Sequence, residues 1–197
     1  MPDGIPPAGR ETPRASRRGR HTLAWIAAVT LAPIFASYAV YYFFPRAATA
    51  NYGSLLPTAP IPGVEGKRPD GSPFRLDDLR GQWILVVQGS GDCDAACEGR
   101  LYATRQARTM QGKERERIAR VFLRTGGAEL PKALVAQHPE LVVARITPSV
   151  AAKFPGGPGS LYLVDPLGNL VLRYPDDPDI KKMAGDLTRL LKASRIG

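Results

Sequence analysis

The chain is organised around the stretch Gly89-Ser90-Gly91-Asp92-Cys93-Asp94-Ala95-Ala96-Cys97, which contains its only two cysteines. The run Trp83-Ile84-Leu85-Val86-Val87 before it is short, apolar and rich in β-branched residues, which predicts a buried strand. The glycines of the stretch end this strand, and the residues that follow favour a helix capped by one of the two aspartates. We therefore expect Cys93 at a strand-to-helix turn and Cys97 in the first helical turn.

Two cysteines with this spacing can act together. Residues i and i+4 share one face of a helix with their Cα atoms about 6 Å apart, a separation that a disulfide can bridge. The two sulfurs can therefore form a disulfide or share a metal ion. The positive end of the helix dipole favours the thiolate form, and Asp92, Asp94 and Glu98 oppose it. The alternative is a purely structural disulfide, but closing so short a loop contributes only about 2 kcal/mol.

The overall composition limits the classes of function. The 197 residues, 44% of them hydrophobic, suffice for one domain with appendages. The formal net charge is +9, but neither Arg/Gly repeats nor aromatic stacking platforms accompany it. We therefore expect no nucleic-acid partner.

The first part of the chain predicts a membrane anchor. Residues 1–21 are rich in Pro, Gly and Arg and are expected to form a disordered, basic, cytoplasmic tail. Residues 22–44 contain no charged side chain and are long enough to form a transmembrane helix. A cleaved signal peptide ending at Ala48-Thr49-Ala50 is the alternative, but the apolar segment exceeds the length usual for one.

The remaining residues are expected outside the cytoplasm, because the arginines precede the anchor and keep the N-terminus inside. Residues 45–63 contain four prolines and are expected to be a semi-rigid linker. Residues 64–197 are expected to form the domain. The sequence thus predicts a single-pass protein of the inner (cytoplasmic) membrane with its C-terminal domain in the periplasm.

The domain alternates strands and helices and ends in a hairpin and a helix, which predicts an α/β fold with a mixed sheet and helices on both faces. A small hairpin at 67–80 is expected to lead into the strand before the cysteines. We expect strands at 82–88, 118–124, 141–146, 161–165 and 169–174, and helices at 94–111, 131–138, 148–154 and 178–193. The central strand should bury Leu85 and Val87, or Ile84 and Val86 in the other register.

A strand that ends in a cysteine pair at a helix start, followed later by Gly156-Gly157-Pro158-Gly159, a strand and the turn Asp165-Pro166-Leu167-Gly168, resembles the thioredoxin superfamily. The three-residue gap between the cysteines, the membrane anchor and the segment 161–168 are most similar to the Sco (SenC) family. That resemblance implies a thioredoxin-like fold and a role in assembling the CuA centre of cytochrome c oxidase. In that family two cysteines and a histidine bind copper, and Cys93 and Cys97 match the cysteines.

The sequence departs from the family pattern at several positions. Asp94 and Glu98 stand where the family usually has prolines, and Gly157 stands at the position of the histidine. His138, on a predicted loop, is expected to be solvated, although it is the first candidate for a replacement ligand. The two thiolates alone suit Cu(I), a soft ion that accepts low coordination.

Two further features leave alternatives open. Pro158 is either the cis-proline that the superfamily places opposite its cysteines or an ordinary loop proline. The basic residues between Arg100 and Arg120 are either a solvated helix face or a docking surface for anionic lipid or an acidic partner.

Three functions follow from these observations. The first is a thiol–disulfide oxidoreductase that keeps cysteines of the CuA-bearing oxidase subunit, or of another periplasmic thiol protein, reduced. The attacking thiolate would be Cys93, expected to be the more exposed of the pair, and Cys97 would resolve the mixed disulfide. The second is a chaperone that binds Cu(I) through both cysteines without redox turnover. The third is a non-catalytic interaction protein of the oxidase assembly machinery.

Overall fold

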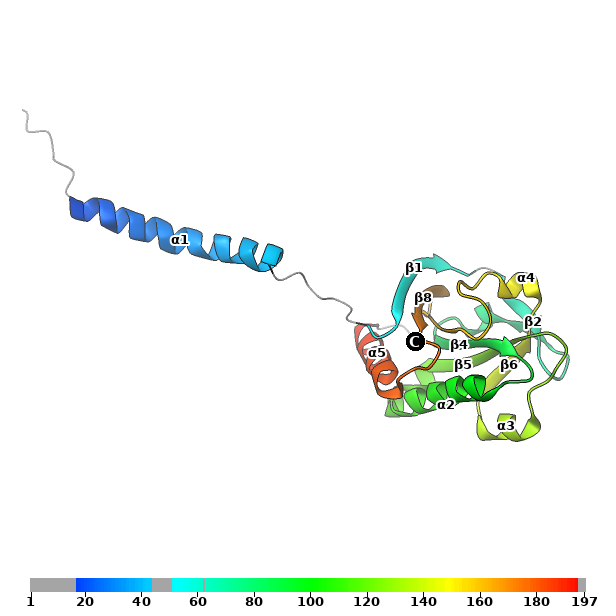
Figure 1. Ribbon diagram of the computed structural model, residues 1–197. Coiled ribbons are helices and arrows are strands. Elements are labelled where there is room, and N and C mark those ends of the chain that lie inside the picture. The colour runs from blue at the N-terminus through cyan, green and yellow to red at the C-terminus, as the bar shows by residue number, and fades with distance from the viewer. Residues whose placement is uncertain (1–16, 44–50, 62, 195–197) are drawn as a thin grey trace, which may run out of the picture. The chain divides into compact units, whose positions relative to one another are not determined.

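The computed structural model describes residues 17–43, 51–61 and 63–194. The chain separates into two units, Met1–Ala48 and Thr49–Gly197. The described helices and strands, labelled in Figure 1, are α1 (Arg17–Phe43), β1 (Ser54–Pro60), β2 (Glu65–Lys67), β3 (Pro73–Arg75), η1 (Leu76–Leu79), β4 (Trp83–Ser90), α2 (Ala95–Thr109), η2 (Gly112–Arg117), β5 (Ile118–Thr125), α3 (Lys132–Gln137), β6 (Leu141–Arg145), α4 (Pro148–Ala151), β7 (Leu161–Val164), β8 (Asn169–Tyr174) and α5 (Ile180–Ala193).

The first unit contains the predicted transmembrane helix. Helix α1 is continuous through Pro33, and the segment His21–Val40 is long and apolar enough to cross a bilayer. The predicted start at residue 22 lies inside this helix, which begins at Arg17. Residue 44 and the predicted tail up to residue 16 lie outside the described residues.

The second unit is a mixed eight-stranded sheet in the order β1-β8-β7-β4-β5-β6-β2-β3. Strands β4, β5 and β6 run parallel, and β7 pairs antiparallel with β4. Helices α2 and α5 lie along one face of the sheet, while α4 lies on the other (Figure 1). The predicted α/β arrangement with a mixed sheet, including the small hairpin of β2 and β3, is confirmed.

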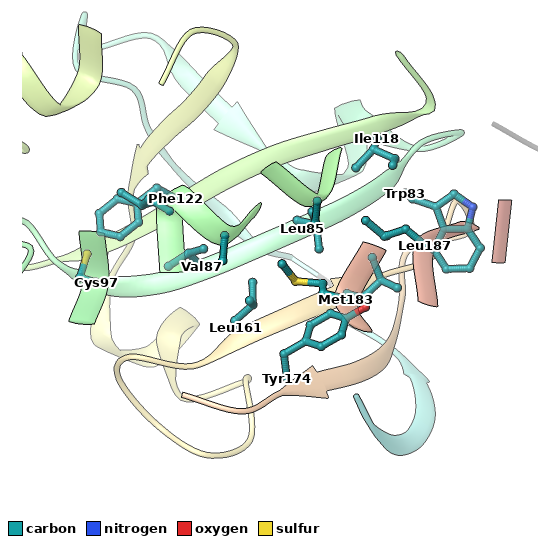
Figure 2. Packing of buried hydrophobic residues seen from close by; sticks show 14 of the residues in the cluster. Trp83, Leu85, Val87, Cys97, Ile118, Phe122, Leu161, Tyr174, Met183 and Leu187 are labelled. Atoms are coloured by element: carbon teal, nitrogen blue, oxygen red, sulfur yellow. The ribbon is translucent and has the colours of Figure 1, made fainter. Parts of the chain in front are cut away.

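Strand β4 lies in the middle of the sheet and is buried on both faces. Leu85 and Val87 belong to the cluster that includes residues of α2 and α5, with Met183 near Leu85 and Cys97 near Val87 (Figure 2). Ile84 and Val86 belong to the cluster on the opposite face. Both alternative sets of predicted buried residues are therefore buried, one on each face of the strand. This is why the run is apolar at every position instead of alternating.

Several predicted boundaries differ from the structure. Strand β4 continues to Ser90, two residues beyond the predicted end, because it pairs with β5 as far as Thr125. Helix α4 ends at Ala151 rather than at residue 154, and α2 ends at Thr109 before the short helix η2. Helix α5 begins at Ile180 instead of residue 178, since the Asp179 side chain caps it by accepting from the Lys182 amide.

The predicted linker at 45–63 contains an edge strand. Strand β1 pairs antiparallel with β8, and its register shifts between Leu55 and Ala59. Pro57 falls in this irregular part, as expected for a proline on an edge strand, where a missing N–H costs least. The residues just before β1 are held by Asp186 of α5. Its buried carboxylate accepts hydrogen bonds from the amides of Tyr52 and Gly53 at 2.9 Å. These residues belong to the domain.

Candidate functional site

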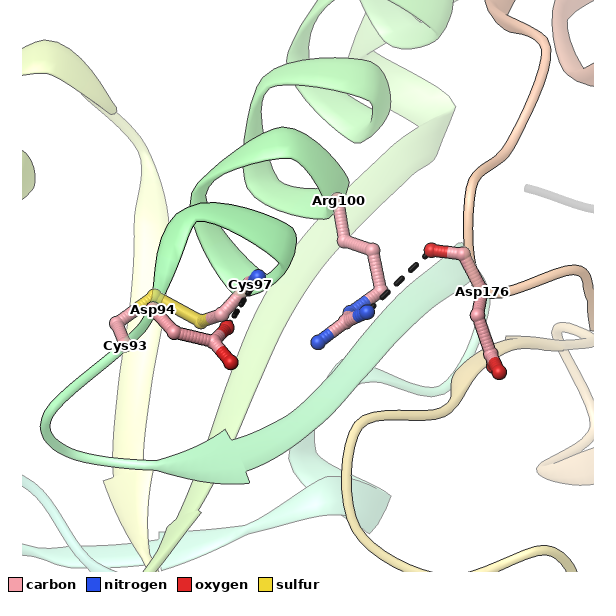
Figure 3. The surroundings of a disulfide bond; sticks show 5 residues. All are labelled: Cys93, Asp94, Cys97, Arg100 and Asp176. Carbon is pink, nitrogen blue, oxygen red and sulfur yellow. Dashed lines mark hydrogen bonds between the residues drawn. A yellow bond between two sulfur atoms is a disulfide. The ribbon is translucent and has the colours of Figure 1, made fainter.

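Cys93 and Cys97 form a disulfide at the N-terminus of α2, with their Cα atoms 5.1 Å apart (Figure 3). Asp94 is the N-cap: its Oδ1 accepts a hydrogen bond from the Cys97 amide at 2.9 Å. The predicted placement of one cysteine at the turn and the other in the first helical turn is what the structure shows. Cys93 has a positive φ of 35°, a conformation that is uncommon for a residue other than glycine and often marks a functional site.

The exposure of the two cysteines differs from the prediction. Cys93 is 5% exposed and Cys97 is 4% exposed, so both are buried and exposure does not distinguish them. The turn before α2 lies very close to the loop that follows β5. A Cβ placed on Gly91 would lie only 1.9 Å from the Ala128 carbonyl oxygen, so only glycine fits at this position. This close approach of two backbones packs the disulfide into the core cluster that also contains Phe122 and Leu130.

A cleft of about 700 Å³ opens beside the disulfide, and Cys97 rather than Cys93 lines it. Gly89 contributes to the same wall, and a Cβ on this residue would lie 3.9 Å from the Cys97 sulfur. Across the cleft stands the loop with Gly156, Pro158 and Gly159. The described residues contain no cis peptide bond, so Pro158 faces the cysteine site as a trans-proline.

Two arginines complete the cleft, and sequence reasoning did not identify them as site residues. Arg100 lies three residues after Cys97, hence on the same face of α2, and is only 7% exposed. Its Nη1 donates to the Asp176 carbonyl oxygen at 3.3 Å, and its Nε has no hydrogen-bond partner within the described chain (Figure 3). Arg173 of β8 also lines the cleft, with its Nη2 3.8 Å from a carboxylate oxygen of Asp176.

Of the two alternatives for the basic run, a solvated helix face does not hold for Arg100 and Arg120, the residues at its two ends. Arg100 is buried against the cleft, and Arg120 is 2% exposed. Arg120 donates to the Thr104 hydroxyl at 3.1 Å and to the Leu101 carbonyl oxygen at 2.9 Å. Burial lowers the pKa of Arg120 to about 10. The spacing of Arg100 from Cys97 was the available signal that its side chain belongs to the cysteine site.

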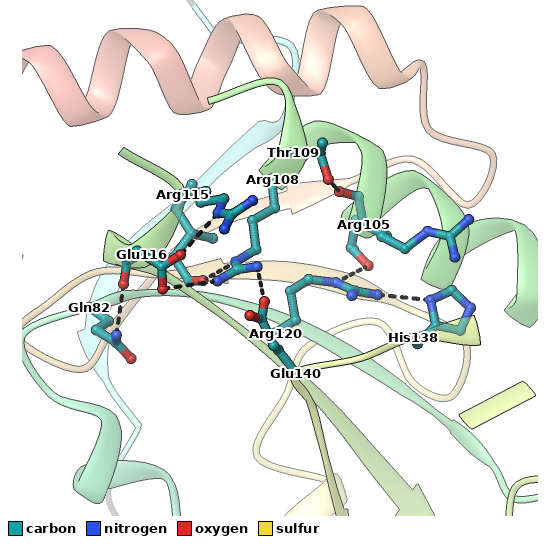
Figure 4. Close-up of polar contacts among 11 residues, drawn as sticks. Gln82, Arg105, Arg108, Thr109, Arg115, Glu116, Arg120, His138 and Glu140 are labelled. Carbon is teal, nitrogen blue, oxygen red and sulfur yellow. Dashed lines mark hydrogen bonds and ion pairs between the residues drawn. The ribbon is translucent and has the colours of Figure 1, made fainter. Parts of the chain in front are cut away.

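His138 is buried, not solvated as predicted, and 4% exposed. Its Nδ1 lies 3.2 Å from the Arg120 Nη2 (Figure 4). Burial, followed by the charges of Arg120 and Arg105, lowers its pKa to about 4. No group of three His, Cys, Asp or Glu side chains in the described part of the chain is arranged to hold a metal ion. The His138 Nδ1 is instead engaged with the Arg120 guanidinium.

The fold and the site define a thioredoxin-like protein with a helix-start disulfide beside an open cleft. A family model described as "Transmembrane-like, thioredoxin-like, C-terminal domain" matches residues 83–194, and the chain belongs to this family. A search of curated proteins found no match.

Among solved structures, the chain is similar to apo Sco1 from Thermus thermophilus, with 24% identity, a TM-score of 0.60, and coverage of 73% of this chain and 99% of that chain. Copper-bound ScoI from Arabidopsis thaliana shares 17% identity at a TM-score of 0.56, covering 73% and 100% of the two chains. Copper-bound yeast Sco1 shares 16% identity at a TM-score of 0.55, covering 73% and 90%. The predicted resemblance to Sco proteins thus holds for the fold.

Proposed function

We propose that the chain is a membrane-anchored thiol–disulfide exchange protein of the Sco type that acts in assembly of the CuA centre of cytochrome c oxidase. The observation that carries this proposal is the Cys93–Cys97 disulfide at the start of α2, beside a cleft that reaches one of its sulfurs. The family and the fold neighbours support it. The domain would stand in the periplasm, held by α1 in the inner membrane.

The exchange would run through two thiolate attacks. In the reduced protein one cysteine thiolate attacks a disulfide of the client, a bond forms between the two sulfurs, and the client's other sulfur leaves as a thiolate. The second cysteine thiolate then attacks the mixed disulfide, which releases the client in its dithiol form and leaves the Cys93–Cys97 disulfide. Two electrons pass to the client, and a periplasmic dithiol reductant would restore the reduced pair.

We infer that the client reaches Cys97, which reverses the roles expected from the sequence. The two cysteines have almost the same exposed fraction, so burial does not tell which one a client meets first. The cleft, however, is lined by Cys97 and not by Cys93. Cys93 belongs to the turn that follows Gly91, does not line the cleft, and would act as the resolving residue.

Single-cysteine variants test this assignment. Cys93→Ser and Cys97→Ser proteins are treated with 2-hydroxyethyl disulfide, and the adduct is followed by intact mass. The Cys93→Ser protein, which keeps Cys97, should form the adduct faster, and unfolding in urea should remove the difference. Faster reaction of the Cys97→Ser protein would restore the opposite assignment. For the role in oxidase assembly, cells carrying only the Cys93→Ser/Cys97→Ser protein should make oxidase with depleted CuA, and normal CuA content would contradict that role.

A Cu(I) chaperone is the second candidate, because two fold neighbours were solved with copper bound. The donor set here is two sulfurs, with Gly157 at the position that the resemblance assigns to a histidine. Two thiolates suit Cu(I) as transferred cargo but leave Cu(II), which prefers nitrogen and oxygen donors, without its ligands. A non-catalytic interaction protein remains the third candidate. The adduct assay separates it from the first candidate, because cysteines that form only a structural disulfide need not react with 2-hydroxyethyl disulfide in the folded protein.

A further inference from the structure

The floor of the cleft carries a positive charge that no carboxylate in the described chain neutralises at close range. Arg100 is 7% exposed, and its one hydrogen bond in the described chain goes to a backbone carbonyl, that of Asp176. No ion pair joins Arg100 to a carboxylate of the described residues. A guanidinium has five N–H donors, and a buried donor without a partner is costly. The Arg100 Nε is such a donor.

Arg173 lies on the same cleft wall. Its Nε also has no hydrogen-bond partner within the described residues, and its ion pair with Asp176 is long, at 3.8 Å. The loop opposite fits closely around the two guanidinium groups. A Cβ on Gly156 would lie 2.6 Å from the Arg173 Cζ, and one on Gly159 would lie 3.4 Å from an Arg100 nitrogen. Side chains on these two glycines would crowd the guanidinium groups, and both arginines line the cleft.

Acidic residues are also present, but they stand at the rim. Asp92, Asp94 and Asp176 are exposed, so water screens their charges. Asp94 already accepts from the Cys97 amide, and Asp176 lies beside Arg173. The buried guanidinium next to Cys97 is therefore the strongest electrostatic feature that a ligand in the cleft would meet.

We propose that the cleft is a binding site for a carboxylate carried by the thiol that exchanges with the disulfide, and that Arg100 with Arg173 holds this carboxylate. A planar guanidinium matches a carboxylate through two parallel hydrogen bonds. Cys97 is three residues from Arg100 on one helix face, so a carboxylate on the arginine brings a nearby sulfur to the disulfide. The proposal rests on the proposed exchange function and names its substrate class, a thiol with a carboxylate a few bonds from its sulfur.

The reaction in question is reduction of the Cys93–Cys97 disulfide. The incoming thiolate attacks one protein sulfur, forms a new S–S bond with it and releases the other protein sulfur as a thiolate. A second thiolate then attacks the sulfur of the first thiol and releases the remaining protein sulfur as a thiolate. Two thiols are oxidised to one disulfide, and the protein disulfide gains two electrons.

The test uses the full chain in detergent and two isosteric thiols, 3-mercaptopropionate and 3-mercaptopropionamide. The rate of disulfide opening is measured by alkylation and intact mass, and the carboxylate-to-amide rate ratio is compared between proteins, which cancels the intrinsic reactivity of each thiol. Arg100→Gln should lower this ratio about tenfold relative to wild type, the size expected for a charge-assisted hydrogen bond. Arg100→Lys should keep part of it. Asp176→Asn, which retains the backbone carbonyl that Arg100 contacts, should raise it.

Arg145→Gln is the matched control, because Arg145 is exposed on β6 and does not line the cleft. Its ratio should equal that of wild type. Short peptides containing Cys-Glu or Cys-Gln show whether the natural thiol belongs to a protein or to a small molecule. Faster disulfide opening by the Cys-Glu peptide than by the Cys-Gln peptide indicates a protein cysteine beside an acidic residue. A rate difference between the two small thiols but not between the peptides indicates a low-molecular-weight reductant. Rapid opening with one ratio in all variants overturns the carboxylate site alone. A disulfide that neither thiol opens overturns the exchange function as well.

Discussion

His138 should make the stability of the domain depend on pH between about 4 and 7. A guanidinium can only donate hydrogen bonds, so the His138 Nδ1, 3.2 Å from the Arg120 Nη2, must accept, and the folded protein holds the ring neutral. Burial is the main cause and the charges of Arg120 and Arg105 the lesser ones that lower the His138 pKa from 6.5 to about 4.

The sign of the effect follows from proton uptake. In the unfolded chain the imidazole binds a proton near pH 6.5, while the folded protein resists protonation until about pH 4. The unfolded state therefore binds more protons in this window, and its population grows as the pH falls. Stability is complete above the unfolded pKa and is lost on acidification. At pH 5 the shift corresponds to about 2 kcal/mol of lost stability relative to neutral pH.

The measurement is urea unfolding of the full chain in detergent at pH 7 and pH 5, with His138→Gln as the matched variant. The Gln amide oxygen can accept from Arg120 and does not titrate, while all carboxylates titrate equally in both proteins. Wild type should lose about 2 kcal/mol more than His138→Gln between the two pH values. Equal losses would show that the ring is not a buried neutral acceptor, and the reasoning would fail.

Three further predictions concern the site and the anchor. Gly91→Ala should lower the free energy of unfolding of the domain in urea by about 3 kcal/mol, because the added methyl group would meet the Ala128 carbonyl oxygen. The control Gly99→Ala, which has open space around it on α2, should raise the free energy of unfolding by about 1 kcal/mol. Equal effects of the two substitutions would contradict the close approach at Gly91. Anaerobic titration of the reduced protein with Cu(II) should give no persistent thiolate charge-transfer band, while Gly157→His should gain one; a stable stoichiometric band in wild type would favour the chaperone. An alkaline phosphatase fusion after residue 60 should be active, and an inactive fusion beside an active cytoplasmic reporter would reverse the topology.

The central part of the fold was predictable from the sequence for a physical reason. A strand covered on both faces must be apolar at every position, and the run before Gly89 has that pattern. The cysteine spacing and the aspartates fix the helix start through local geometry alone. Strand β1 was not predictable, because Pro57 and Pro60 read as linker residues and only pairing with β8 shows that the segment is an edge strand.

The cleft could be predicted only in part. The cysteines are visible as a motif, but the burial of Arg100 depends on the loop at 156–159 and on the Asp176 carbonyl, which are distant in sequence. A charged residue in a basic run is usually solvated, so the sequence favoured solvent exposure for Arg100 and Arg120. A histidine on a loop is also usually solvated, so His138 was expected to be exposed as well. All three side chains are buried. Tertiary contacts decide such cases, since a long side chain can be buried by elements that follow it much later in the chain.

The residues around the disulfide bear on the choice between thiol exchange and copper transfer. A third ligand at residue 157 would have to adopt a positive φ of 78°, a conformation that costs a side-chain-bearing residue about 1 kcal/mol or more, so the glycine there suits the turn as it stands. Two guanidinium groups line the cleft together with Cys97, and a positive charge there opposes a metal cation while it favours an anionic thiol. Both features act in the same direction, and together they favour an exchange partner with a carboxylate over a copper ion as the species that meets Cys97.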